Sequence, residues 1–117
     1  MSGTKHGTLN EYLDAGETGT ILAAPDSGDT LFIQTLLVSS DTEGQVTIVD
    51  SGDNSTFVSA HLGATGGFIM PLPERGVPLS AADAYLFIVP ETSGNYSATV
   101  VGDSRYMGPS HTPSLGV

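Results

Sequence analysis

The sequence predicts an all-β fold, an antiparallel β-sandwich or jelly roll of about seven or eight strands with extended N- and C-terminal arms. Short apolar runs recur about every ten residues, and clusters of turn residues separate them. No interval between the runs can hold the crossover helix that a parallel sheet requires. The composition agrees, because 15 glycines and 7 prolines favour many turns while charged residues make up only 14% of the chain.

The length of 117 residues predicts a single folded unit that buries about two thirds of its unfolded surface. We expect an N-terminal arm over residues 1–17, a β-sandwich domain over 18–102 and an extended C-terminal tail over 103–117. The chain has no cysteine, which removes disulfide frameworks and thiolate chemistry.

The charge balance excludes one class of partner. The formal net charge is −10, and the only cations are Lys5, Arg75 and Arg105. Binding to nucleic acid or to an anionic membrane needs clustered lysine and arginine, so neither is expected as a partner. The first residues also lack the apolar segment of a secretory signal, and no run reaches the length of a membrane span.

The N-terminal arm is expected to contain one short helix. Residues 8–11 match a capping box, with Thr8 at the cap and Glu11 three positions later. Leu9, Tyr12 and Leu13 follow at helical spacing, and a glycine three residues later would end the helix. A helix this short is marginal in water, so it should dock on another surface.

The longest apolar run, TLFIQTLLVSS at residues 30–40, organises the expected sheet. Side chains alternate between the two faces of a strand, so Leu31 and Ile33 would lie opposite Leu36. Both faces would then be apolar, which predicts a strand in the middle of a sheet with cover on each side. A second sheet or another subunit would supply that cover.

The other strand candidates are runs rich in apolar and β-branched residues, at 18–24, 45–49, 55–62, 68–72, 84–89 and 96–101. The run AYLFIV at 84–89 is the second with two apolar faces, and residues 79–83 fit a single helical turn. The turn sequence DSGD occurs at 26–29 and again at 50–53. Shared turn chemistry explains this repeat, because the flanking strands are not similar.

Few residues suggest a metal site. The histidines His6, His61 and His111 are far apart in the sequence, and zinc needs three or four converging ligands. The acidic turns offer oxygen ligands that calcium would accept, namely Asp26, Asp29, Asp50, Asp53 and Asn54. They lack the spacing and distal glutamate of an EF-hand loop, so turn formation is the favoured interpretation and calcium stays an open alternative.

No catalytic motif is present. The sequence has no nucleophile elbow, no zinc-protease motif and no lysine-containing phosphate loop. Nothing selects a pair of carboxylates for glycoside hydrolysis. We therefore expect neither an enzyme nor a cofactor.

Four segments carry a resemblance to a known group of proteins. They are ILAAP at residues 21–25 followed by the run at 31–39, the strand at 46–49, the stretch SAHLGATGGFIMPLPERGVPL at 59–79, and SAADAYLF at 80–87. With these segments the chain resembles small phage virion proteins, and the resemblance covers residues 20–101. The resemblance implies a compact β-sandwich or jelly roll that decorates or cements an icosahedral head, often as a trimer, or sits on a tail fibre.

We accordingly expect a non-enzymatic virion structural protein, a capsid decoration or cement subunit on the outer surface of the capsid. Two strands with two apolar faces hold more apolar surface than one small sandwich buries, which favours a closed oligomer. The expected partners are further copies of the chain, as a homotrimer, and the major capsid protein. The arms would bridge neighbouring capsid proteins, with Arg105 paired to a carboxylate of the partner. The expected partner contacts are Leu9, Tyr12, Leu13, Arg105, Tyr106, Met107, Leu115 and Val117.

The alternative is a receptor- or glycan-binding module of a phage head or tail fibre. Such a module should present a tyrosine or phenylalanine beside polar groups in a groove. A hydrolase would instead need a cleft with converging carboxylates.

Overall fold

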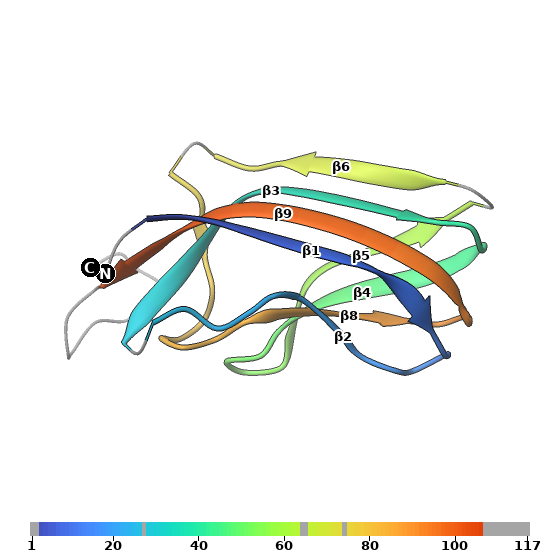
Figure 1. The fold of residues 1–117 in the computed structure, drawn as a ribbon, viewed down its shortest axis with the longest axis horizontal. Coiled ribbons are helices and arrows are strands. Elements are labelled where there is room, and N and C mark those ends of the chain that lie inside the picture. Colours follow the sequence, from blue (N-terminus) through green and yellow to red (C-terminus); the bar gives the residue numbers. More distant parts are fainter. Residues whose placement is uncertain (1–2, 27, 64–65, 74, 107–117) are drawn as a thin grey trace.

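The computed structural model describes residues 3–26, 28–63, 66–73 and 75–106, which form two antiparallel sheets packed face to face (Figure 1). The first sheet has the order β1-β9-β3-β6, with the short β7 also paired to β3. Its strands are β1 (Gly3–Leu13), β9 (Gly94–Tyr106), β3 (Asp29–Ser40), β6 (Gly67–Pro71) and β7 (Val77–Pro78). The second sheet has the order β2-β8-β4-β5. Its strands are β2 (Gly19–Leu22), β8 (Leu86–Pro90), β4 (Gly44–Asp50) and β5 (Ser55–Leu62).

The connectivity is that of a jelly roll. The first strand pairs with the last, β2 pairs with β8, β3 pairs with β6, and β4 pairs with β5. A chain doubled back in this way and then rolled up gives two sheets whose neighbouring strands are mostly far apart in the sequence. The predicted antiparallel sandwich is confirmed, and no helix in the described residues is long and apolar enough to cross a membrane.

The core lies between the two sheets and is formed by the inward-facing side chains of both. Leu36 and Val100 of the first sheet and Ile48 and Ile88 of the second have no exposed surface. Each such side chain contributes about 1.5–3 kcal/mol when it leaves water, so this layer supplies most of the driving force for folding.

The helix expected near the N-terminus is wrong, because these residues form β1. Leu9 and Leu13 are four apart, a spacing that puts two side chains on one side of a strand as well as of a helix. In β1 both face the core, while Tyr12 faces solvent. The register with β9 is unbroken from Gly3 opposite Ser104 to Leu13 opposite Gly94, and this long ladder replaces the few hydrogen bonds of a short helix.

The expected domain boundaries therefore fall inside the sandwich. Residues 3–13 form an edge strand of the first sheet, so the N-terminal arm is part of the folded unit. At the other end, residues 103–106 belong to β9 and not to a tail. Residues 107–117 lie outside the described part of the chain.

The central strand β3 has a β-bulge that explains its unusual pattern. Ile33 lies opposite Gly102 and Thr35 opposite Val101, which leaves Gln34 as the extra residue. An extra residue reverses the alternation of side chains, so Ile33 and Leu36 both face the core although their spacing is odd. The prediction of two apolar faces assumed unbroken alternation along the strand. Because the bulge interrupts it, most of the apolar side chains of β3 face the core.

The strand β8 alternates regularly. Leu86 and Ile88 have no exposed surface, while Phe87 and Val89 are half-buried on the outer face of the second sheet. The ring of Tyr85 lies 5.7 Å from that of Phe87 and covers part of it. The helical turn expected at 79–83 is a loop instead, in which Asp83 has a φ of 67°.

Candidate functional site

The residues expected to contact a partner do not form one surface. Leu9 is 6% exposed and Leu13 is 1% exposed, so both are core residues, and the expectation that they anchor a neighbour is wrong. Tyr12 and Tyr106 are 56% and 58% exposed, and they lie at opposite ends of the first sheet. Met107, Leu115 and Val117 lie outside the described residues.

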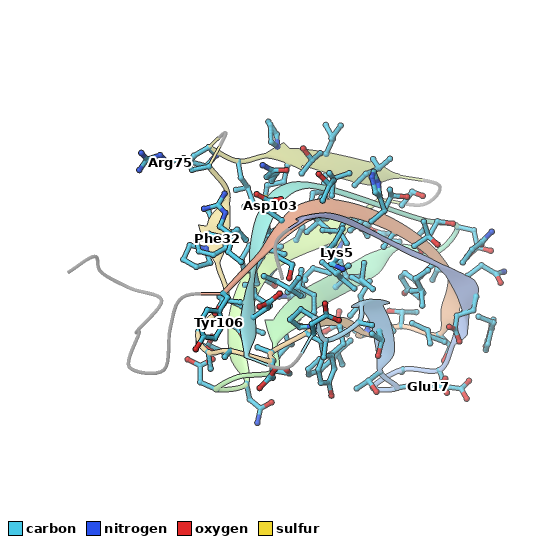
Figure 2. The ribbon with its side chains drawn as sticks, turned by 60° about the vertical axis from the view of Figure 1, so that its left-hand side comes forward. Lys5, Glu17, Phe32, Arg75, Asp103 and Tyr106 are labelled. Carbon is cyan, nitrogen blue, oxygen red and sulfur yellow. The ribbon has the colours of Figure 1, made fainter. Side chains whose placement is uncertain are left out.

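Arg105 is held within its own chain. Its guanidinium carbon lies 4.2 Å from the centre of the Phe32 ring, and its Nε and Nη2 each lie 3.2 Å from Oδ2 of Asp103. Nη2 also donates to the carbonyl oxygen of Arg75 at 2.8 Å. Figure 2 shows Phe32, Arg75 and Tyr106 gathered toward one side of the molecule, with Glu17 on the far side. The carboxylate expected from a partner is therefore supplied by Asp103.

One long side of the sandwich, the closed margin, is sealed where β1 meets β2. The closed margin consists of Leu9, Leu13, Ile21 and Leu22, none more than 6% exposed. The two backbones approach so closely at Gly7 that a Cβ there would lie 2.1 Å from the carbonyl oxygen of Ile21. Only glycine fits this crossing without displacing one of the strands.

The other long side, the open margin, lies where the edge strands β5 and β6 face each other across the sandwich (Figure 1). Its side chains pack against the core but remain only half-buried: Phe57, Val58, Phe68, Met70 and Leu72. Beside it on the outer face of the first sheet, Ile69 is 64% exposed and lies opposite Leu37, which is 44% exposed. The open margin therefore leaves apolar side chains partly in contact with water, unlike the closed margin.

A second surface, the polar depression, lies on the outer face of the first sheet at the end far from Arg105. It is a shallow open hollow of about 300 Å³. Its lining is entirely hydroxyl, amide and carboxylate residues, namely Ser39, Ser40, Asp41, Asn95 and Ser97. Tyr12 lies directly opposite Asn95 in the ladder between β1 and β9, which puts an exposed ring beside the hollow.

Hydrogen bonds fix the side chains that line the polar depression. Oδ1 of Asp41 accepts from the Asn95 N–H at 3.0 Å, and Oδ2 accepts from Asn95 Nδ2 at 2.9 Å. The Thr42 hydroxyl donates to Asp41 Oδ1 at 2.8 Å. The Asn95 side chain, then its backbone N–H and the Thr42 hydroxyl, hold the pKa of Asp41 below its usual value. Asp41 therefore stays ionised in neutral solution.

Three of the aspartates considered as calcium ligands, Asp29, Asp50 and Asp53, accept hydrogen bonds within the fold. Asp50 is 5% exposed, and its carboxylate accepts from the N–H groups of Gly52 at 2.8 Å and Ser80 at 2.7 Å. Asp29 is fully buried and accepts from the Ser104 hydroxyl at 2.8 Å. Among residues 3–26, 28–63, 66–73 and 75–106, no three histidine or acidic side chains gather as a metal site would require.

Of the histidines, His61 has an acidic neighbour. Its Nε2 lies 3.5 Å from Oε2 of Glu43, with both side chains largely in solvent. An exposed pair of this kind contributes little to stability, and nothing around it resembles a catalytic arrangement.

Sequence reasoning missed the residues of the polar depression because they are scattered. Ser39 and Ser97 come from two strands far apart in the sequence, and only the ladder register between β3 and β9 brings them together. Serine and asparagine on the solvent face of a strand carry no signal by themselves. The sequence also predicted Tyr12 as a partner contact on a helix that does not form, and in β1 its side chain is exposed.

No protein-family model and no curated protein sequence matches the chain. The fold is nevertheless similar to solved structures. A chain of the cyanophage Pam1 capsid asymmetric unit has a TM-score of 0.51 with 13% identity, covering 89% of this chain and 84% of that one. The tobacco streak virus coat protein, solved as a dimer, has a TM-score of 0.53 with 9% identity, covering 97% and 91%.

A third similar structure is a subunit of the pili that form Bacillus endospore appendages. Its TM-score is 0.53 with 8% identity, over 92% of this chain and 90% of that one. At these identities the likeness establishes a shared fold.

Proposed function

We propose that this chain is a structural subunit of a virion, which acts by packing against neighbouring protein subunits and not by turnover. The observation that carries the proposal is the open margin, where half-buried side chains of β5 and β6 lie beside the exposed Ile69. A neighbouring subunit seated there would remove this apolar surface from water. Two of the similar folds come from a phage capsid and a viral coat, which supports this setting.

The more specific form of the proposal is a decoration or cement subunit on the outer surface of the capsid. It would contact the major capsid protein and further copies of itself, as a trimer. The N-terminal strand cannot serve as a bridging arm, because β1 is built into the sandwich. The bridging contacts are therefore assigned to the open margin, with residues 107–117 as the remaining candidate arm.

The similar pilus subunit raises the alternative of assembly into a filament. The Bacillus appendages are disulfide-linked pili, whereas the present sequence contains no cysteine. These 117 residues therefore cannot form such disulfide links.

Native mass measured by light scattering tests the proposal, followed by co-sedimentation with purified virus particles. The Ile69→Asp variant should stay folded, because the side chain is 64% exposed, and should shift the protein toward monomer. Thr20→Asp is the matched control, since Thr20 is exposed on β2 at the closed margin. A protein that is strictly monomeric at high concentration and ignores particles would overturn the proposal.

A further inference from the structure

The polar depression is a shallow hollow between rows of larger side chains. Its floor is low because Ser97 and Ser39, directly opposite each other, are small. The adjoining rows carry larger side chains, Tyr12 on one side and the facing pair Leu37 and Ile69 on the other. A volume of about 300 Å³ is at the small end for ligand sites, enough for one or two sugar rings.

The polar groups of the site are prearranged and partly unused. Asp41 and Asn95 hold each other through two hydrogen bonds, and the Ser97 hydroxyl donates to Asn10 Oδ1 at 3.2 Å. Within the described part of the chain, no group hydrogen-bonds the Ser39 hydroxyl or the Asn95 Oδ1. A ligand rich in hydroxyl groups would therefore find both donors and acceptors already in position.

The aromatic ring beside the polar floor completes the pattern. Tyr12 and Asn95 are directly opposite in neighbouring strands, which puts their Cβ atoms about 4.5–5.5 Å apart. A tyrosine ring gives a rigid, flat and apolar surface with a polar tip. Sugars have the complementary form, with an apolar ring face and hydroxyl groups at the edge.

The negative charge of the chain favours neutral sugars over anionic ones. The net charge is −10, Asp41 is in the floor, and the cations Lys5 and Arg105 lie near the opposite end of the sheet. An anionic ligand would be repelled and would meet no compensating cation. From these observations we infer that the polar depression binds neutral saccharides, with Tyr12 against the sugar ring and Asp41, Asn95, Ser39 and Ser97 bonded to its hydroxyl groups.

This inference does not depend on the proposed function, because a single subunit carries every residue of the site, although the site borders the Leu37 and Ile69 pair beside the open margin. As probes we choose maltohexaose, cellohexaose and laminarihexaose, added to the full chain labelled with ¹⁵N. We expect at least one to shift the amide signals of residues 10–12, 39–41 and 95–97, with a dissociation constant of about 0.1–1 mM. Polygalacturonate, an anionic polymer, should leave these signals unchanged.

Substitutions at three exposed positions test which side chains bind the saccharide. Tyr12→Ala should weaken binding about tenfold or more, whereas Tyr12→Phe should keep it. Tyr106→Ala is the matched control, because Tyr106 has the same exposure at the other end of the sheet and should not affect binding. Ser39→Leu, also on the exposed face, should fill the floor and abolish binding.

Two results would overturn the inference. One is that none of the three oligosaccharides shifts the signals of the polar depression. The other is binding that Tyr12→Ala and Ser39→Leu leave unchanged, which would place the sugar elsewhere. Neither result bears on self-association, so the proposed function would stand or fall separately.

Discussion

The two long sides of the sandwich differ in how they finish the core. At the closed margin β1 crosses β2 at Gly7, and Leu13 and Ile21 are almost completely buried. At the open margin β5 and β6 leave side chains such as Met70 and Phe57 half-buried. Each long side has two edge strands, but only β1 and β2 bury the apolar side chains between them. The closed margin thus completes the core within the chain, whereas the open margin leaves apolar side chains partly in contact with water.

The largest expected effect contrasts one leucine from each side. Leu13→Ala should lower the free energy of unfolding by about 2–5 kcal/mol, because the cavity would lie in a fully packed site. Leu72→Ala should cost only about 1–2 kcal/mol, since Leu72 is half-buried. Urea unfolding of dilute protein measures both values. Equal losses would contradict the comparison, and a loss at Leu72 that grows with protein concentration would support a partner at the open margin.

A smaller effect tests the close crossing of the closed margin. Gly7→Ala should cost about 1–3 kcal/mol or more, because the new methyl would lie 2.1 Å from the Ile21 carbonyl oxygen and force the strands apart. Gly63→Ala, with no atom within 4 Å of the added Cβ, is the control and should be nearly neutral. Thermal unfolding followed by circular dichroism compares the two. A tolerated Gly7→Ala would mean that the closed margin is loose.

The comparison also shows what the sequence could and could not reveal. The alternation and turn spacing were sufficient for the sandwich, because they depend on local periodicity. The N-terminal strand was mistaken for a helix because the Leu9 to Leu13 spacing suits both structures. Only the ladder with β9, between the two ends of the sequence, decides between them.

We expected partners because two strands, residues 30–40 and 84–89, had two apolar faces in the sequence. The bulge in β3 removes most of one of these faces. The bulge at Gln34 places Ile33 and Leu36 on the same side, and no feature of the sequence marks it. Likewise, the site beside Tyr12 depends on registers between distant strands. The open margin also could not be located before the order of strands was known.

The smallest effect concerns pH and the beginning of β5. The Ser55 hydroxyl, then the Ser55 N–H at 3.0 Å, hold the pKa of Asp53 below its ordinary value of 3.8. A carboxylate with a lowered pKa stabilises the fold above its unfolded pKa, and this contribution is lost as the pH falls through the folded value. Acid should therefore loosen the start of β5, which borders the open margin, before it affects β1. Amide hydrogen exchange at Ser55 should accelerate below about pH 4 relative to the intrinsic rate, while that at Leu9 should not. In Asp53→Asn the acid-dependent difference should disappear, and its persistence would show that another group controls this edge.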